Sequence, residues 1–241
     1  MAEWATLDGF TITGVGGFDA LLWQKHWEEQ GKNQSHEHIG KFGSPAIAIT
    51  GLNCTVINNI VRHNGDAGIA IRGVEGKQCA PLVSGNFCYR NMGGGIGSMK
   101  GSTALIDSNT CFENFYAGIG HNGASPLVTR NVCYNNVRAG IGVSEGASPV
   151  VRNNRCYGNR RAGIGVRAGV ATHPVVEDNE CYENEMAGIG TEDEATPIIR
   201  GNRCYRNKLA GIGCRNGSSP LITDNHCFKN KAAGIGVDSA S

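Results

Sequence analysis

One hydrophobic and polar pattern repeats along this chain at an interval longer than the period of any helix or strand. The motif NxCYxNxxAGIG recurs every 22 to 25 residues and accounts for most of residues 86–241. An earlier copy has Val61 at the cysteine position. The cysteines in register are Cys88, Cys111, Cys133, Cys156, Cys181, Cys204 and Cys227. A repeat of this length predicts a solenoid, in which each unit buries its apolar face only when its neighbours stack on it.

Each repeat contains three short segments that have the alternation of a strand. In residues 162–166 (AGIGV) larger side chains alternate with glycine, so one face carries Ala, Ile and Val and the other is bare. A second strand is predicted at residues 148–151 and a third at residues 155–157. Helical repeats would need two long runs of period 3.6, for which such a unit has no room. The sequence therefore predicts an all-β solenoid of about eight or nine three-stranded coils.

Two columns of asparagine keep the same steps as the cysteines. They comprise Asn59, Asn86, Asn109, Asn131, Asn154, Asn179, Asn202 and Asn225, and Asn64, Asn91, Asn114, Asn136, Asn159, Asn184, Asn207 and Asn230. Asparagine tolerates left-handed backbone geometry, so we expect these residues to turn the corners of the coils. Stacked amides can also hydrogen-bond along a column.

The repeats resemble those of right-handed parallel β-helix proteins of the pectin-lyase-like superfamily, in particular the short parallel-β-helix repeats of carbohydrate-binding and sugar-hydrolysis domains. The resemblance covers residues 44–241, and residues 5–14 (ATLDGFTITG) are similar to a first coil of bacterial members. It implies the fold but not the function, because lyases, hydrolases, epimerases, binding modules and adhesins share this fold. The paired-aspartate and Gly-His-Gly motifs of polygalacturonase-like hydrolases and the Asp-Pro-His motif of alginate epimerases are missing.

Composition and charge narrow the remaining classes. The chain has 36 glycines, seven prolines and 18% charged residues, as expected for an ordered, turn-rich protein. We interpret residues 1–241 as a single β-helix domain, with an insertion at 14–43 and regular coils at 44–241. A net charge of +1 provides no general attraction to nucleic acid or membranes, and no apolar run approaches the roughly 20 residues of a membrane span.

The start of the chain has neither the charged residues nor the apolar stretch of a signal peptide. Because it enters directly into a strand, we expect it to be a fragment of a longer protein. A column of reduced cysteines is compatible with the cytoplasm, whereas the family resemblance favours an extracellular location. The sequence leaves the compartment open.

The cysteine column is interpreted as a row of small buried hydrophobic side chains. Parallel side chains fit disulfide geometry poorly, and a linear column lacks the tetrahedral convergence that zinc requires. The three cysteines outside the column, Cys54, Cys79 and Cys214, are expected to be unpaired.

An aromatic residue follows each cysteine, and alternation places it on the outer face. Exposed aromatic ladders can hold sugar rings, which makes Tyr134, Tyr157, Tyr182 and Tyr205 candidate substrate-binding residues. The rings can also stabilise the sheet by stacking on each other, at about 0.5–1.5 kcal/mol a pair. Both interpretations remain open.

Charged residues alternate in sign between successive coils. Three such columns are Arg152, Glu177 and Arg200; Arg155, Glu180 and Arg203; and Arg160, Glu185 and Lys208. Opposite charges on adjacent strands attract and like charges repel, so the columns help to fix which coil stacks on which. Because they cancel the local field, they argue against a polyanion such as pectate or alginate along the central coils.

The glycines of the AGIG segments predict a strip without side chains. The pairs include Gly118 and Gly120, Gly140 and Gly142, and Gly163 and Gly165. Such a strip allows a second copy of the protein or an extended polymer to approach closely, or it serves only to permit a tight bend. Self-association through the strip or through open coil ends is therefore one prediction.

The insertion at 14–43 contains a predicted amphipathic helix at residues 18–29. Its buried side is expected to carry Phe18, Leu21, Leu22 and either Trp23 or Trp27. His36 and His38 flank a glutamate after this helix and are candidate ligands for a divalent metal such as zinc or copper, the one cofactor that the sequence suggests.

A long turn at residues 72–79 and its neighbouring coils hold the other chemically varied residues. The candidate catalytic set is His63, Asp66, Arg72, Lys100 and His121, because general acid–base work on a sugar needs such groups within hydrogen-bond reach of one another.

Two classes of function remain. The first is a rigid scaffold or a glycan-binding or assembly module without a clear catalytic constellation. The alternative is a polysaccharide lyase, hydrolase or epimerase with its site near the insertion and the first coils. A third interpretation, based on the histidines and cysteines, likens the chain to periplasmic β-helix proteins that help to mature copper sites.

Overall fold

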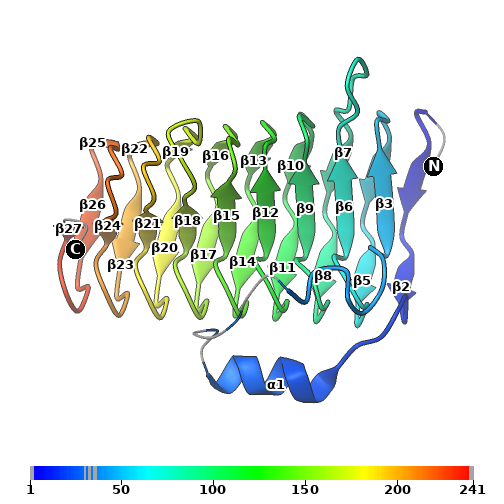
Figure 1. Ribbon diagram of the computed structural model, residues 1–241, viewed down its shortest axis with the longest axis horizontal. Coiled ribbons are helices and arrows are strands. Elements are labelled where there is room, and N and C mark those ends of the chain that lie inside the picture. Colours follow the sequence, from blue (N-terminus) through cyan, green and yellow to red (C-terminus); the bar gives the residue numbers. More distant parts are fainter. Residues whose placement is uncertain (1–2, 30, 32–33, 35–36, 239–241) are drawn as a thin grey trace.

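The chain winds into a stack of three-sided coils, with one strand of each coil in each of three parallel sheets (Figure 1). The computed structural model describes all residues except 1–2, 30, 32–33, 35–36 and 239–241. The prediction of an all-β parallel β-helix is confirmed.

The three sheets have nine strands each in the described part of the chain. Sheet A contains β1 (Thr6–Asp8), β4 (Thr55–Ile57), β7 (Leu82–Ser84), β10 (Leu105–Asp107), β13 (Leu127–Thr129), β16 (Val150–Arg152), β19 (Val175–Glu177), β22 (Ile198–Arg200) and β25 (Leu221–Thr223). Sheet B contains β2 (Thr11–Thr13), β5 (Ile60–Arg62), β8 (Phe87–Tyr89), β11 (Thr110–Phe112), β14 (Val132–Tyr134), β17 (Arg155–Tyr157), β20 (Glu180–Tyr182), β23 (Arg203–Tyr205) and β26 (His226–Phe228). Sheet C contains β3 (Ile47–Thr50), β6 (Ile69–Arg72), β9 (Ile96–Met99), β12 (Ile119–Asn122), β15 (Ile141–Ser144), β18 (Ile164–Val166), β21 (Ile189–Thr191), β24 (Ile212–Cys214) and β27 (Ile235–Val237).

The core is built from columns of equivalent residues. Cys133 pairs in register with Cys156 in sheet B, and Ile141 pairs with Ile164 in sheet C. These four side chains are fully buried. Because each inward column repeats one kind of residue, every coil buries the same apolar surface against the next. All ten cysteines are free, as expected.

The two asparagine columns form buried hydrogen-bonded ladders. The Nδ2 group of Asn131 donates to the Oδ1 atom of Asn154 at 3.0 Å and to the backbone carbonyl groups of Ile106 and Thr129. The Oδ1 atom of Asn131 accepts from the backbone N–H of Asn109 at 2.9 Å. Each side chain thus satisfies backbone groups that the corner would otherwise leave unpaired.

The left-handed residue at these corners is the one before the ladder asparagine. Arg130 has a φ of 55° and Asn153 a φ of 56°, whereas neither Asn131 nor Asn154 is among the residues with positive φ. The expectation that the ladder asparagines themselves adopt this geometry is therefore wrong. The preceding residue turns the chain, and the turn directs the asparagine amide into the corner, where it makes its ladder bonds.

The insertion carries a single helix in its described part, α1 (Ala20–Glu28), which lies along the side of the stack (Figure 1). Asp19 caps it by accepting a hydrogen bond from the backbone N–H of Leu22 at 2.9 Å. Trp23 and His26 are buried, but Leu21 is 85% exposed, so its prediction as a buried residue is wrong. Residues 22, 23, 26 and 27 share the face that packs on the coils, which leaves Leu21 on the solvent side.

No helix in the described residues is long and apolar enough to cross a membrane.

Candidate functional site

The structure divides the five predicted catalytic residues among three places. His63 and Asp66 lie at the turn between β5 and β6, where the ring of His63 meets Phe18 edge-on at 5.1 Å. Arg72 and Lys100 lie at the opposite end of the sheet C strands. Burial raises the pKa of the Asp66 carboxyl, although backbone N–H groups of Ala67 and Gly40 oppose the shift.

His121 points into the core. It is only 3% exposed, and neither ring nitrogen has a hydrogen-bond partner among the described groups. Burial lowers the pKa of this imidazole to about 3. A side chain in this position cannot contact a polysaccharide outside the coils, so His121 joins neither His63 and Asp66 nor Arg72 and Lys100.

Arg72 and Lys100 line a shallow pocket with a volume of about 640 Å³. The loop that projects between β6 and β7 forms one wall and contributes Glu75 and Lys77. No ion pair within the described chain joins Arg72, Lys77 or Lys100 to an acidic side chain. The pocket therefore has three cationic groups and one carboxylate.

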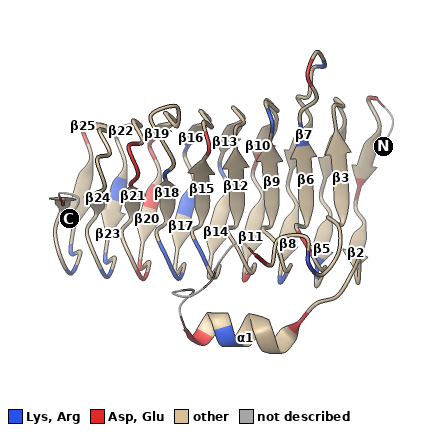
Figure 2. Ribbon diagram, viewed as in Figure 1, with Lys and Arg blue, Asp and Glu red and all other residues tan. Residues whose placement is uncertain are grey.

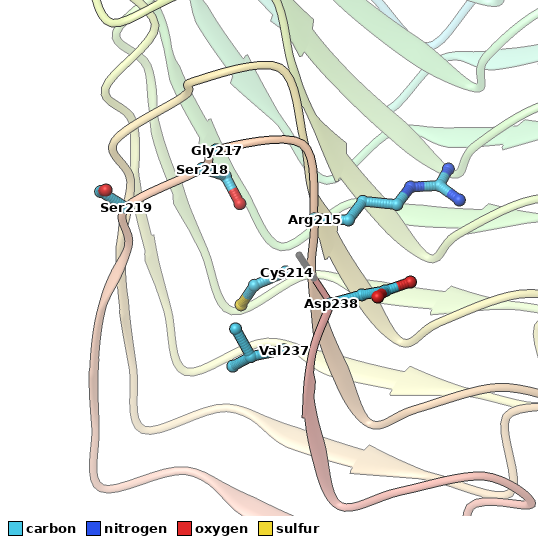
Figure 3. A pocket seen from close by; sticks show the side chains of 7 residues that line it. All are labelled: Cys214, Arg215, Gly217, Ser218, Ser219, Val237 and Asp238. Atoms are coloured by element: carbon cyan, nitrogen blue, oxygen red, sulfur yellow. The ribbon is translucent and has the colours of Figure 1, made fainter. Parts of the chain in front are cut away.

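A second hollow, of about 380 Å³, lies at the last described coil. Figure 3 shows the side chains of Cys214, Ser218 and Val237 directed into it, while those of Arg215 and Asp238 point away. The hollow thus presents no charged group to a ligand.

The alternating charged columns form the expected ion pairs across neighbouring coils. Glu180 lies 3.3 Å from Arg155 and 3.6 Å from Arg203. Glu177 pairs with Arg200 at 2.6 Å. The change of sign is visible along β17, β20 and β23 in Figure 2. These surfaces of sheets A and B are locally neutral, as the sequence predicts.

The aromatic column stacks face to face. Tyr134 and Tyr157 have ring centroids 5.1 Å apart with planes at 4°, and Tyr182 and Tyr205 are 5.0 Å apart at 3°. The ring faces that a sugar would need are therefore covered by the neighbouring rings. Two hydroxyl groups are also engaged, because Arg155 donates to the Tyr182 oxygen and Tyr205 donates to Glu180. Only ring edges remain for the predicted substrate contacts of these four tyrosines.

The two glycines of each AGIG segment have different roles, which corrects the expectation that both face outward. A Cβ atom at Gly140 would lie 2.7 Å from the carbonyl oxygen of Gly163 and 2.9 Å from the Asn159 side chain, so this glycine is required by close packing at the corner. A Cβ atom at Gly142 would meet only the methyl group of Ala117, at 3.7 Å. The outer face of sheet C therefore carries one column of glycine beside one column of alanine.

We call this face the glycine floor. Each sheet C strand from β9 to β27 contributes one glycine: Gly97, Gly120, Gly142, Gly165, Gly190, Gly213 and Gly236.

Arginines stand on both sides of the glycine floor. Arg138 and Arg161 occupy the position before the alanine column, and a backbone hydrogen bond of 3.3 Å joins them. Arg167 and Arg215 follow the strands on the opposite side. The Nη2 atom of Arg138 donates to the carbonyl oxygen of Gln34 at 3.1 Å, and that of Arg161 donates to the carbonyl oxygen of Gly31, so the insertion helps to hold both side chains in place.

These arginines influence one another across the floor. Burial lowers the pKa of Arg138 to about 10, and the positive charges of Arg161 and Arg167 contribute to the shift. The pKa of Arg161 is lowered in the same way, by burial and by Arg167. Cations from the two sides thus lie close enough to repel, which favours an anion between them. The carboxylate of Glu192 already opposes both pKa shifts.

Arg138 and Arg161 were not among the site residues predicted from the sequence, although their repeat position distinguishes them. The repeat position of Arg138 and Arg161 holds Met186 and Leu209 in the following coils. The next coil therefore offers no acidic residue in this column, whereas Glu180 lies between two arginines in sheet B. The same column holds Asp66 and Tyr116 in earlier coils.

Only one of the two metal ligands predicted from the sequence lies within the described residues. His36 lies outside the described residues. His38 pairs with Glu37, with 3.4 Å between Nε2 and the carboxylate. In the part of the chain that the structure describes, no group of three or more His, Cys, Asp or Glu side chains is arranged to hold a metal ion.

Stacked parallel coils, in-register core columns and asparagine ladders define a class of protein. The sequence model of the right handed beta helix region matches residues 38–171 and 121–241, and the chain belongs to this family.

Several solved structures are similar to the chain. A double mutant of the periplasmic alginate epimerase AlgG aligns with a TM-score of 0.61 at 18% identity, covering 83% of this chain and 52% of that one. The A-module of the mannuronan C-5 epimerase AlgE6 from Azotobacter vinelandii aligns with a TM-score of 0.53 at 15% identity, covering 78% of this chain and 58% of that one. This level of likeness shows the fold alone.

The chain thus spans about half the length of these two solved structures. No curated protein matches it.

Proposed function

We propose that this chain is a β-helix module that binds an acidic polysaccharide along the glycine floor. The observation that carries the proposal is the side-chain-free strip of sheet C with arginines on both sides, Arg138 and Arg161 on one and Arg167 on the other. The strip admits an extended polymer, and guanidinium groups pair with carboxylates through two parallel hydrogen bonds.

The floor has the dimensions of a polymer site. Its glycines occupy seven successive strands, and at about 4.8 Å per strand they extend over about 29 Å, enough for several sugar units. The pocket with Arg72 and Lys100 lies beside the same sheet, close to its N-terminal end, and adds further positive charge. The neutral charge columns of Glu177 and Glu180 belong to sheets A and B, and that of Glu185 lies at the corner between sheets B and C. At the ends of the sheet C strands Glu192 pairs with Arg215 at 2.6 Å, so the proposed site rests on Arg138, Arg161 and Arg167.

The comparisons support the ligand class. Two structural neighbours are epimerases of alginate and mannuronan, which are polymers of acidic sugars. Because the identity is below 20%, the likeness supports an acidic glycan as a ligand and does not carry over the reaction.

A polysaccharide-active enzyme is the second candidate. Asp66 favours it, since burial raises the pKa of its carboxyl and so increases the fraction that carries the proton a general acid must donate. Asp66 also lies in the same column as Tyr116 and Arg138, beside the proposed polymer site. The missing Asp-Pro-His motif and the scattered positions of His63, Arg72, Lys100 and His121 argue for binding rather than turnover.

Calorimetric titration with alginate tests the proposal, with a neutral glucan as the reference ligand. We expect binding of alginate that weakens as salt is added, because exposed charges are screened. Arg161→Ala should lower the affinity at least tenfold, whereas Arg203→Ala, an exposed arginine on sheet B, should leave it unchanged. Equal binding of the neutral glucan, or equal effects of the two variants, would exclude an arginine-lined site on sheet C.

The same samples distinguish the enzyme from the binding module. Incubation with alginate, pectate and neutral glycans is followed by assays for new reducing ends and unsaturated products and by proton NMR for inversion at C5. We expect no change in the polymers. Turnover that is lost in Asp66→Asn would replace the binding proposal with the catalytic one.

A further inference from the structure

The insertion and the coils enclose a group of buried polar side chains that the glycan site does not use. His26 in α1 is 6% exposed, and its Nδ1 atom has no hydrogen-bond partner among the described groups. The Nδ1 atom of His38 and the Oε1 atom of Gln34 are also buried without a partner. Three unsatisfied atoms in so small a region are unusual, because buried polar atoms nearly always find a hydrogen bond.

These side chains gather around one residue of the coils. The ring of His26 meets Phe115 edge-on at 5.2 Å, and the ring of His38 meets it at 5.9 Å. Gln34 donates from Nε2 to the carbonyl oxygen of Phe115, so its Oε1 atom remains free. The two imidazole rings themselves are 5.9 Å apart, at an angle of 63°.

We infer that His26 and His38 bind a divalent transition metal of the zinc class, with Gln34 or water as the oxygen ligand. This site goes beyond the proposed glycan function and does not depend on it. It keeps His38 of the pair expected from the sequence and adds His26 of the helix.

The ring geometry suits a shared ion. A nitrogen–zinc bond of about 2.0–2.1 Å places each imidazole centre about 3.2 Å from the metal, so two centres up to about 6 Å apart can bind one ion. Imidazole is a preferred ligand of zinc, copper and nickel and a poor one for calcium and magnesium.

The surroundings of both histidines prepare them as ligands. Glu37 lies 3.4 Å from the Nε2 atom of His38, and a carboxylate at one ring nitrogen directs the metal to the other. His26 is buried against Phe115, which holds its ring in place. The site holds fewer than three His, Cys, Asp or Glu ligands, so water would complete the coordination.

A bound metal would link three parts of the molecule. His26 belongs to α1, His38 follows the loop, and both pack on Phe115 of the coil between β11 and β12. The same loop supplies the carbonyl oxygen atoms that hold Arg138 and Arg161. Metal binding should therefore stabilise the contact between the insertion and the coils.

The test uses the whole chain, stripped with chelator and titrated with zinc chloride by calorimetry, with calcium chloride as the hard-cation control. We expect one zinc ion per chain, a rise in the melting temperature and no calcium binding. His26→Phe, which keeps a flat ring against Phe115, and His38→Asn should each weaken zinc binding at least about 100-fold. His173→Asn, an exposed histidine elsewhere, should leave it unchanged.

Cobalt chloride provides a second readout, because ten free cysteines offer an alternative set of ligands. Binding to imidazole and oxygen gives visible ligand-field bands without the near-ultraviolet charge-transfer band of a cobalt–thiolate bond. A thiolate band, an absence of zinc binding, or full affinity in folded His26→Phe and His38→Asn would each overturn the site. Alginate binding by the same variants is measured separately and is expected to survive, so failure of the metal site leaves the glycan proposal intact.

Discussion

The buried imidazole of His121 provides a quantitative test of the core. Its β12 position pairs with Ser98 on one side and Val143 on the other, and neither neighbour bonds to the ring. The pKa of the ring is about 3 in the folded chain, whereas an unfolded histidine has a pKa of about 6.5. Replacement by valine, the residue at this position in the next coil, should therefore change how stability depends on pH.

The sign follows from the lowered pKa. Above pH 6.5 the ring is neutral in both states and contributes no pH dependence. As the pH falls below 6.5, the unfolded chain binds a proton that the folded chain cannot bind until about pH 3. Stability is lost over this window at about 1.4 kcal/mol per pH unit, or about 5 kcal/mol in total. At pH 4.5 the loss through His121 is about 3 kcal/mol.

Urea unfolding of the wild type and His121→Val at pH 7 and pH 4.5, followed by circular dichroism, measures this effect. The difference in unfolding free energy between the two proteins should grow by about 3 kcal/mol in favour of the variant as the pH is lowered. Carboxylates titrate equally in both proteins and cancel. His173→Val, at an exposed site, should show no such change. A difference that stays constant between the two pH values would refute the buried, unpartnered state of the ring.

Three further predictions concern the repeat itself. Asn131→Ala should cost at least about 3 kcal/mol in urea unfolding, because it leaves the backbone N–H of Asn109 without an acceptor in the core and removes the side-chain bonds to Asn109, Ile106 and Thr129. A loss below 1 kcal/mol would contradict the ladder. Gly163→Ala should lower the melting temperature far more than Gly165→Ala, since only the first Cβ meets a backbone oxygen, at 2.7 Å; equal effects would contradict the assigned facing. Self-association through the glycine floor, which the sequence also predicts, should appear in light scattering at high concentration and be lost when alginate occupies the floor.

The periodicity predicts the fold well because every coil has the same arrangement of buried and exposed positions. The columns of Cys156 and Ile164 are buried in the inner coils, and opposite charges such as Glu180 and Arg203 pair across coils, so a linear pattern contains the contacts. The pattern also predicts which columns face inward, because alternation along a strand has a period of two.

The candidate site was harder to predict because its residues depend on where corners fall. Gly163 and Gly165 look equivalent in sequence, yet one packs against backbone and the other faces solvent. His121 is of a residue type common in catalytic sites. However, it lies two residues after the buried Ile119 on the same strand, so both side chains point into the core. Arg161 follows Arg160 in sequence, but Arg160 stacks on Trp27 with 3.7 Å between the guanidinium carbon and the ring centre, while Arg161 borders the glycine floor.

The location of the polysaccharide is the central claim, and a single steric variant tests it most directly. Gly165→Val adds a side chain to the middle of the floor, where a Cβ atom meets only the methyl group of Ala139 at 3.8 Å, so the fold should tolerate it. Calorimetry with alginate should show binding to the wild type and at least a tenfold lower affinity for this variant, with an unchanged circular dichroism spectrum. Undiminished alginate affinity in folded Gly165→Val would contradict a polymer lying across sheet C.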